Sequence, residues 1–372
     1  MPAVSSTSEL IKRFAVEAGF DLAGIAPVRE FPDSAHFEEW IAKGYAGEMR
    51  YLEARTEAGE LKRSSLRQAA PWARSVVVCA INYNVDEPRS IESHHSPKAG
   101  ERVGHPQSSV AGHRSSEGWI SRYAWSREDY HDSVLRRLRQ VEAALKREVE
   151  CRTCCYVDTG PVVERMYAKY AGVGWQGKNT CILNQEIGSW LFLGVMLTSL
   201  ELEPDLPAPD RCGTCTACLD ACPTSAFAAP YVLDATKCIS YLTIEKRGEI
   251  PEELREGIGR HVFGCDICQD VCPWNRRAPS TSLPEFQPRE RLVNPALLWL
   301  AEMTVEEFRE RFRGSPIKRT KFSGIRRNVA IAMGNSGNER FVPHLERLAE
   351  DEDENVAAHA RWALEKLKTG VR

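Results

Sequence analysis

Residues 212–223 read Cys212-Gly-Thr-Cys215-Thr-Ala-Cys218-Leu-Asp-Ala-Cys222-Pro223. This is the C-x2-C-x2-C-x3-C-P spacing of bacterial ferredoxins. Two-residue gaps let a short loop wrap around one iron–sulfur cube and present three thiolates to it. The longer gap before Cys222 starts a helical turn, so the fourth thiolate points toward a second cube, and Pro223 fixes the chain direction. The stretch therefore predicts a ferredoxin-like domain with two clusters.

A second run closes the ligand set. It reads Cys265-Asp-Ile-Cys268-Gln-Asp-Val-Cys272-Pro273, with the same ending and one cysteine fewer in the loop. Cys238 lies between the two runs and supplies the missing ligand. Eight cysteines then hold two 4Fe–4S clusters. Cluster one takes Cys212, Cys215, Cys218 and Cys272, and cluster two takes Cys222, Cys238, Cys265 and Cys268.

Other readings of these cysteines fit less well. Zinc also uses C-x2-C pairs, but it explains neither the two Cys-Pro endings nor the exchange of a ligand between runs. A radical-SAM loop needs C-x3-C-x2-C, and Ser225 and Asn275 stand where cysteines would complete it. The remaining five of the thirteen cysteines are expected to pack as small hydrophobic residues.

Composition excludes several classes of protein. The chain has 372 residues and a formal net charge of −3, so a generally basic nucleic-acid coat is excluded. No apolar run approaches the ~18–20 residues that span a bilayer. Residues 1–20 have an amphipathic helical pattern without a cleavable apolar stretch or a twin arginine. We expect a cytoplasmic monomer with no membrane partner.

Hydrophobic patterning divides the chain into three predicted domains. Residues 1–205 alternate strand-like and helical stretches and predict an α/β domain, interrupted by a long Ser-, His-, Pro- and Gly-rich loop at 86–118. Residues 206–285 form the predicted two-cluster domain, and 286–372 a helical domain. The strand-like runs are residues 22–28, 75–82, 155–158 and 190–200.

The end of the chain predicts three amphipathic helices, over residues 325–333, 341–350 and 355–368. The first is expected to stop at Gly334. Residues 329–334 recur loosely at 360–365, as in HEAT-type helical repeats. Such a small array usually docks onto a larger domain and adds a binding surface.

Asp158 is the candidate acid. It follows an apolar strand and precedes a Gly160-Pro161 turn and a helix. Strand ends are where α/β domains present reactive groups, and a half-shielded acid there would have a raised pKa and could deliver a proton. The alternative is that Asp158 caps the following helix or turn.

Two motifs come close to known sites. Gly172–Asn179 has the G-x4-G-K spacing of a P-loop, but Asn179 replaces the required hydroxyl residue and a helix is expected before the loop, so ATP binding is not expected. A turn whose amides face another ligand is left open. Asp129-Tyr-His131-Asp-Ser-Val134 half-matches D-x-H-x-x-G but lacks the glycine, so no histidine-ligated cobalamin is predicted. Cobalamin with an open lower face is not excluded.

Positive charge is concentrated near the C-terminal helices. Residues 309–327 hold eight Lys or Arg against one Glu, a bias that suggests a phosphate-rich partner. A smaller basic group, Lys246-Arg247, lies between Cys238 and Cys265 and is therefore expected near cluster two.

Together these residues resemble the epoxyqueuosine reductase family, cobalamin- and iron–sulfur-dependent enzymes of the last step of queuosine synthesis in tRNA. The resemblance covers nearly the whole chain. Besides the Cys212 run, it is carried by residues 157–165, 174–180, 188–194, 229–234, 238–245, 263–268 and 271–275.

The resemblance implies a reductive-dehalogenase-like α/β core that binds cobalamin base-off, reduced through cluster one and then cluster two by an unidentified donor. It implies a tRNA partner carrying epoxyqueuosine at the anticodon wobble position, whose epoxide oxygen leaves with a proton from Asp158. Segments matching the corrin lining contain Ser240, Cys265 and Asp266. Residues matched to tRNA contacts are Lys246 and Arg247 at the anticodon region, with Lys318, Arg319 and Lys321 on the backbone.

Three rival functions are weighed against this one. A reductive dehalogenase shares the cofactors but usually carries a twin-arginine signal and lacks the helical tail. An electron-transfer ferredoxin fused to a scaffold would bind no corrin. An RNA-binding protein with structural clusters would bind tRNA whether or not it carries epoxyqueuosine.

Overall fold

The computed structural model describes residues 6–57, 59–87 and 116–369. Most of the segment predicted as a long loop, residues 88–115, lies outside the described residues. No helix in the described ranges is long and apolar enough to cross a membrane.

A four-stranded sheet organises the first part of the chain. Its order is β1-β2-β7-β4, and every neighbouring pair is antiparallel. The strand positions match the predicted runs closely, but strand ends in an antiparallel sheet alternate between two edges. Asp158 therefore does not lie at a carboxyl edge shared by parallel strands, contrary to the prediction from the sequence. The strands are β1 (Leu22–Pro27), β2 (Ser75–Asn82), β4 (Thr153–Tyr156) and β7 (Leu191–Thr198).

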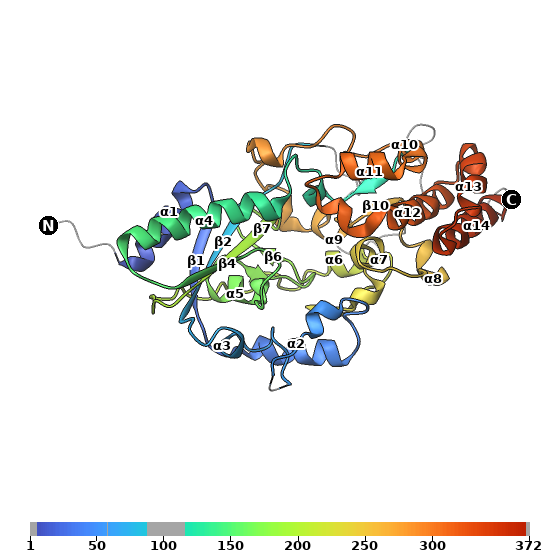
Figure 1. Ribbon diagram of the computed structural model, residues 1–372. Coiled ribbons are helices and arrows are strands. Elements are labelled where there is room, and N and C mark those ends of the chain that lie inside the picture. Colours follow the sequence, from blue (N-terminus) through green and yellow to red (C-terminus); the bar gives the residue numbers. More distant parts are fainter. Residues whose placement is uncertain (1–5, 58, 88–115, 370–372) are drawn as a thin grey trace.

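Both faces of the sheet are covered (Figure 1). Alternate residues of a strand point to opposite faces. In β2, Val77, Cys79 and Ile81 share a core with α1 (Thr7–Glu17) and α4 (Tyr130–Glu148). Val76, Val78 and Ala80 share the other core with α5 (Glu164–Tyr170). The amphipathic pattern of the first helix is confirmed, and α2 (Pro32–Ala42) and α3 (Leu66–Ala69) lie on the α5 side.

Short elements carry the cysteines. The helices α6 and α9 pack against each other, and α7 follows Cys238. Three two-stranded sheets lie in or next to this region: β5 with β6, β8 with β9, and β3 with β10. The bounds are α6 (Ala217–Asp220), α7 (Ile239–Ile244), α8 (Glu252–Arg255), α9 (Ile267–Asp270), β3 (Trp119–Ile120), β5 (Trp175–Gln176), β6 (Ile182–Leu183), β8 (Phe227–Ala229), β9 (Val232–Leu233) and β10 (His261–Phe263).

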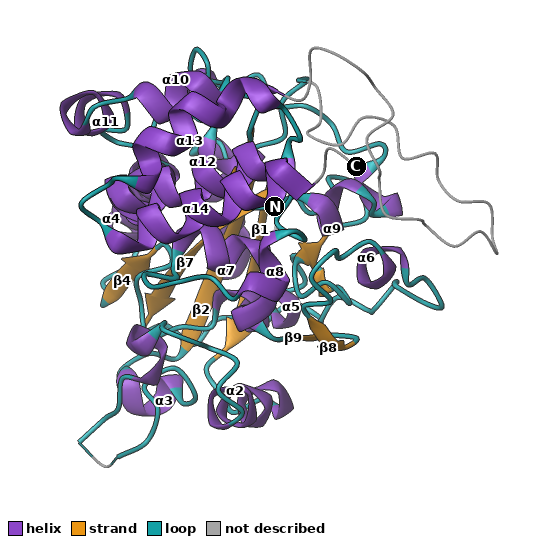
Figure 2. Cartoon of the chain, turned by 90° about the vertical axis from the view of Figure 1, so that its right-hand side faces the viewer, coloured by secondary structure: helices purple, strands orange, loops and turns teal. Residues whose placement is uncertain are grey.

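The chain ends in helices, as predicted, and Figure 2 views the molecule from this side. α12 differs from the prediction, because it begins earlier and continues through Gly334. A Cβ at Gly334 would lie 2.7 Å from the Cβ of Ala363, so the glycine allows α12 to approach α14 instead of ending the helix. The bounds are α10 (Leu297–Glu302), α11 (Val305–Arg311), α12 (Lys321–Asn335), α13 (Val342–Ala349) and α14 (Glu354–Thr369).

Candidate functional site

The first cysteine group gathers around α6. Burial, followed by the neighbouring thiols of Cys272, Cys215 and Cys212, raises the pKa of Cys218 to about 12. Cys272 is likewise affected by burial and by Cys212 and Cys215, with its pKa raised to about 11. These four thiols therefore lie close enough to interact. They are the residues predicted for cluster one.

The second group forms around α7 and α9. Burial raises the pKa of Cys265, with Cys238 and Cys222 adding to the shift. The Cys268 pKa is raised by a hydrogen bond with Cys181 and by burial, and Cys265 and Cys238 contribute. These are the residues predicted for cluster two, joined by one further cysteine, Cys181. All thirteen cysteines are free thiols.

The packing of α6 on α9 explains why the groups exchange a ligand. Cys218 lies within α6 and Cys222 two residues after it, while Cys268 lies within α9 and Cys272 two residues after it. The cysteine within each short helix thus belongs to the group formed by its own run, and the cysteine two residues after the helix belongs to the other group.

Backbone amides point at the sulfurs. The Ala226 amide donates to Cys222 Sγ at 3.4 Å. Amides of Ser240 and Tyr241 donate to Cys238, which precedes α7, and oppose the rise in pKa that burial causes. Hydrogen bonds of this kind stabilise the thiolate form that iron requires. Amide donors of this kind are typical of sulfurs that ligate iron–sulfur clusters.

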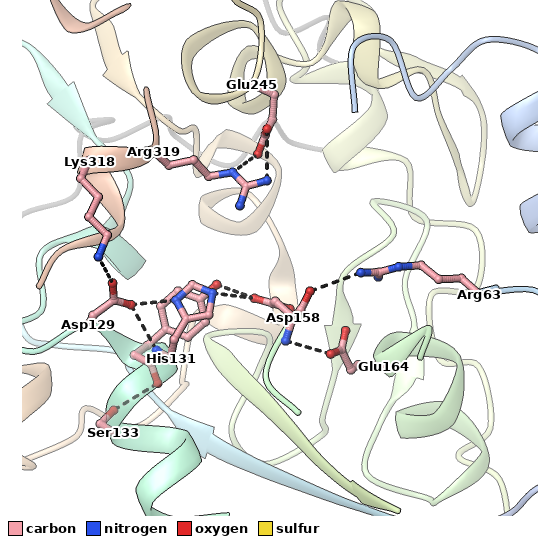
Figure 3. Close-up of polar contacts among 10 residues, drawn as sticks. Arg63, Asp129, His131, Ser133, Asp158, Glu164, Glu245, Lys318 and Arg319 are labelled. Atoms are coloured by element: carbon pink, nitrogen blue, oxygen red, sulfur yellow. Dashed lines mark hydrogen bonds and ion pairs between the residues drawn. The ribbon is translucent and has the colours of Figure 1, made fainter. Parts of the chain in front are cut away.

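Asp158 stands at the sheet edge, two residues after β4 (Figure 3). Its backbone is left-handed, with φ of 56°, and its side chain is 53% exposed. The Tyr130 hydroxyl donates to Asp158 Oδ2, and His131 Nε2 lies 3.9 Å from the same oxygen. The helix α5 has Val163 as its N-cap and no side-chain cap, so Asp158 does not cap it.

Sequence reasoning missed Tyr130 and His131. They begin α4, and Asp129 is the N-cap of that helix. Asp129 Oδ1 lies 2.7 Å from His131 Nδ1, which fixes the orientation of the imidazole toward Asp158. Burial opposes ionisation of Asp129, but the hydrogen bonds from His131 hold its pKa below the ordinary value. The only signal for these residues is the half-matching Asp129–Val134 motif, whose pattern points to cobalt rather than to a partner of an acid.

Glu164 is a second acid at this site, buried next to the half-exposed Asp158. Its Oε1 accepts the Asp158 backbone N–H at 2.9 Å, and the Arg63 guanidinium donates to the Asp158 carbonyl oxygen at 3.4 Å. Burial, with the charge of Asp158 as a second cause, raises the pKa of Glu164 to about 8. A glutamate in the first turn of a helix is ordinarily exposed, so nothing in the sequence marks this one.

An ion pair faces Asp158 (Figure 3). Arg319 binds Glu245 through two hydrogen bonds, the longer of 3.2 Å, and its guanidinium lies 5.2 Å from the ring centroid of Tyr51. The Lys318 ammonium lies 3.9 Å from Asp129. Two residues predicted for tRNA contact therefore lie beside the candidate acid.

The three predicted corrin contacts lie at the second cysteine group. Ser240 hydrogen-bonds to the Cys238 thiol, and Cys265 is itself a member of the group. The Asp266 carboxylate is buried, accepts from the Ser121 hydroxyl, and accepts from the Arg122 amide at 2.7 Å. Burial raises its pKa. Asp266 is thus engaged within the protein.

The remaining basic residues divide into exposed and buried ones. Arg247 and Lys321 are exposed, whereas the Lys246 ammonium pairs with Glu48. Arg327 is wrongly counted in the surface patch at 309–327, because it is 1% exposed. Its guanidinium donates to the carbonyl oxygens of Leu242, Lys246 and Gly248, at 2.7, 2.9 and 2.9 Å.

Comparison with known proteins identifies the chain. The family profile described as "4Fe-4S double cluster binding domain" matches residues 211–275, and the one described as "Epoxyqueuosine reductase QueG, DUF1730" matches residues 63–159. The epoxyqueuosine reductase of Pseudomonas aeruginosa is 39% identical and is aligned over 98% of this chain and 96% of its own.

Solved structures agree. A crystal structure of epoxyqueuosine reductase with an epoxyqueuosine-modified tRNA-Tyr stem loop has a TM-score of 0.81 and 31% identity, covering 96% of this chain and 89% of that one. The Bacillus subtilis epoxyqueuosine reductase, solved with a catalytic aspartate loop swung out of the active site, has a TM-score of 0.80 and 31% identity, covering 96% and 90%.

The 4Fe–4S domain and the full-length relatives define an iron–sulfur oxidoreductase. The chain belongs to the epoxyqueuosine reductase family.

Proposed function

We propose that this chain reduces epoxyqueuosine to queuosine at the wobble position of a tRNA anticodon, using cobalamin reduced through two 4Fe–4S clusters. The observation that carries the proposal is the similarity to epoxyqueuosine reductases over 98% of the chain. It is supported by the likeness to a relative that was solved with a modified tRNA stem loop. The reaction is the last step of queuosine synthesis and would take place in the cytoplasm, in a monomer.

The two cysteine groups would hold the clusters in the predicted ligand sets. Cys215, in the first group, is exposed, which supports the arrival of electrons at cluster one from a donor that is still to be identified. Cys222 of the first run belongs to the second group, and Cys272 of the second run belongs to the first group. The two clusters would therefore be neighbours, and electrons would pass from cluster one to cluster two. Cluster two would then lie nearest the substrate.

Cobalamin would be held by Ser240, Cys265 and Asp266, next to the second group. Bound cobalamin would supply a low-potential cobalt centre for the reduction. Tyr123 lies between this group and the Asp158 site, with its ring centroid 6.0 Å from those of Phe263 and Tyr130, and burial, then the charges of Asp266 and Asp158, raise the pKa of its phenol. The engaged Asp266 carboxylate would shape the wall of the site and fix the loop that carries Cys265.

Asp158 would protonate the oxygen that leaves the epoxide carbon. Its carboxyl is half-exposed and so can meet a substrate, unlike the buried Glu164 behind it. Tyr130 and His131 would orient the carboxyl and return a proton to it after turnover. The catalytic aspartate loop of the Bacillus subtilis relative supports this role.

The tRNA would lie across the last helices and the loop after α7. Arg319 and Lys318 border the Asp158 site, and the exposed Lys321 and Arg247, with Lys246, extend the basic surface. We infer that α12, α13 and α14 form the HEAT-like array of the helical domain, residues 286–372, beside the two-cluster domain, residues 206–285, and the cobalamin domain, residues 1–205.

The proposal is tested with protein reconstituted anaerobically with iron, sulfide and cobalamin. Reductant and tRNA bearing epoxyqueuosine are added, and the digested nucleosides are read by mass spectrometry. A loss of one oxygen that requires cobalamin is expected. Unchanged epoxyqueuosine, despite full clusters and bound corrin, would contradict the proposal and leave a cobalamin enzyme with another substrate.

A further inference from the structure

The loop between β5 and β6 touches both cysteine groups. It is the part of the P-loop-like motif that the proposed function leaves unexplained. The loop closes through hydrogen bonds between the Gly177 amide and the Cys181 carbonyl, and between the Thr180 amide and the Gly177 carbonyl, both 2.8 Å. A Cβ at Gly177 would lie 2.1 Å from Leu183 Cδ1, so a larger residue at this position would displace the Leu183 side chain.

Lys178 reaches the first group. Its ammonium donates to the carbonyl oxygens of Gly213 at 2.7 Å and Cys215 at 2.9 Å. Both carbonyls belong to the loop that carries Cys212, Cys215 and Cys218. The lysine therefore fixes that loop and places a positive charge beside it.

Asn179 and Cys181 reach the second group. The buried Asn179 side chain donates to the Cys268 carbonyl oxygen at 3.2 Å and accepts the Cys181 amide at 3.2 Å. The Cys181 and Cys268 thiols hydrogen-bond to each other. Once Cys268 is an iron-bound thiolate it can only accept, so the Cys181 S–H becomes the donor.

The strands beside the loop hold it in place. Trp175 of β5 packs edge-on against Trp274, with ring centroids 5.0 Å apart. Trp175 and Leu183 share a small core with Cys272, and Cys212 packs against it. The Arg165 guanidinium donates to the Thr180 carbonyl at 3.1 Å, which ties the loop to α5.

We propose that the loop Gly177–Cys181 is a positioning element that sets the reduction potentials of both clusters. This inference rests on the cluster assignment of the proposed function. Reduction adds one negative charge to a cluster, so the Lys178 ammonium stabilises reduced cluster one. The Cys181 S–H stabilises electron density on Cys268 and so favours reduced cluster two.

The test is a redox titration of the full chain, loaded with iron and sulfide and followed by electron paramagnetic resonance. Lys178→Gln is expected to shift the reduction equilibrium of cluster one about tenfold toward the oxidised form. This shift corresponds to a fall in its reduction potential of about 59 mV for one electron. Lys178→Arg keeps the charge and should stay near the wild-type value. Lys146→Gln, on α4 and paired with Glu142, is the control for removal of a lysine elsewhere.

Cys181 gives a second, independent comparison. Cys181→Ala removes the hydrogen-bond donor and should lower the reduction potential of cluster two. Cys181→Ser keeps a hydroxyl donor, so its potential should lie close to the wild-type value. A merely structural role would not separate alanine from serine in this direction. If Lys178→Gln loses iron from cluster one while Lys178→Arg keeps it, Lys178 holds the cluster in place, and its role in setting the potential would be overturned.

Failure of the proposed function and failure of the role of this loop give different results. A wild-type protein that takes up no cluster would contradict the proposed function itself. Clusters that load fully, but whose potentials are the same in wild type, Lys178→Gln and Cys181→Ala, would overturn only the role of this loop.

Discussion

The cysteine-bearing loops and the Asp158 loop differ in exposure and in the origin of their partners. All but one of the eight cysteines in the two groups are half-buried or buried, and the sulfurs of Cys222, Cys238 and Cys265 receive hydrogen bonds from amides a few residues away. The Asp158 carboxyl is half-exposed, and it is contacted by Tyr130 and His131, about 28 residues earlier in the chain. The first region is suited to holding permanent groups and the second to meeting a transient substrate.

The largest effect is expected from removing a ligand of the second group. Cys238→Ala should lose about half of the iron and all turnover, because in the proposed assignment four thiolates hold each of two clusters. Cys79→Ala, in β2 and outside both groups, is the control and should keep its iron. Iron and sulfide analysis with the nucleoside assay checks both. Full iron in Cys238→Ala would show that this ligand is wrongly assigned.

The next largest effect concerns the exposed acid. Asp158→Asn keeps the shape but cannot donate a proton, so turnover should fall about 100- to 10,000-fold, the usual contribution of a general acid. Iron content and cobalamin binding should stay at wild-type values. Normal turnover in this variant would remove Asp158 from the mechanism and with it the contrast between the two regions.

A smaller effect is expected on tRNA binding. Replacing Lys318, Arg319 and Lys321 with Ala should weaken binding about tenfold and lower the salt dependence by roughly one unit of slope per lost phosphate contact. Arg319 already pairs with Glu245, so Lys318 and Lys321 should account for most of the change. Binding measured from about 50 to 200 mM salt checks this. Unchanged affinity and slope would place the RNA surface elsewhere.

The smallest effect is a pH dependence of stability from Glu164. Its pKa of about 8 in the folded protein exceeds the value of about 4.3 in an unfolded chain. The folded state therefore binds the proton more tightly, and this stabilisation is complete below about pH 4.3 and is lost as the pH rises through 8. Glu164→Gln stays neutral and keeps the oxygen that accepts the Asp158 amide.

Thermal unfolding at pH 5.5 and pH 8 tests this expectation. The Tm of the wild type should fall more than that of Glu164→Gln, by a few degrees, since about 1 kcal/mol moves the Tm of a large domain by roughly 2–4 °C. Equal falls in the two proteins would mean that Glu164 is ionised throughout. Glu164→Leu, which loses the acceptor, should also lower turnover, while Glu164→Gln should retain it.

The contrast between the two regions also decides what the sequence could predict. Cysteine spacing is a local property, so the two runs by themselves indicate iron–sulfur chemistry. The runs contain one cysteine fewer than two clusters need, and this points to Cys238 as the missing ligand. The family profile over residues 211–275 confirms a 4Fe–4S domain. The ligand partition itself stays a prediction, although the thiols of each proposed set interact in the structure.

The Asp158 site depends on tertiary contacts that no local pattern records. Apolar runs located the strands, but their antiparallel order follows from pairing across distant segments. Arg327 has the same charge as its neighbours, yet three backbone carbonyls hold it inside the protein. Glu164 is buried for a similar reason, because α5 packs beneath the sheet. Such residues are found only once the fold brings their partners together.

We expect electrons from the two cysteine groups to be consumed at the half-exposed Asp158 site. The most direct test is a single turnover of the loaded, pre-reduced enzyme, with excess reductant removed and epoxyqueuosine tRNA added. Cluster spectra and the loss of oxygen from the nucleoside are followed together. We expect cluster oxidation to accompany queuosine formation, and Asp158→Asn to slow both. Queuosine formed while both clusters stay reduced would contradict it.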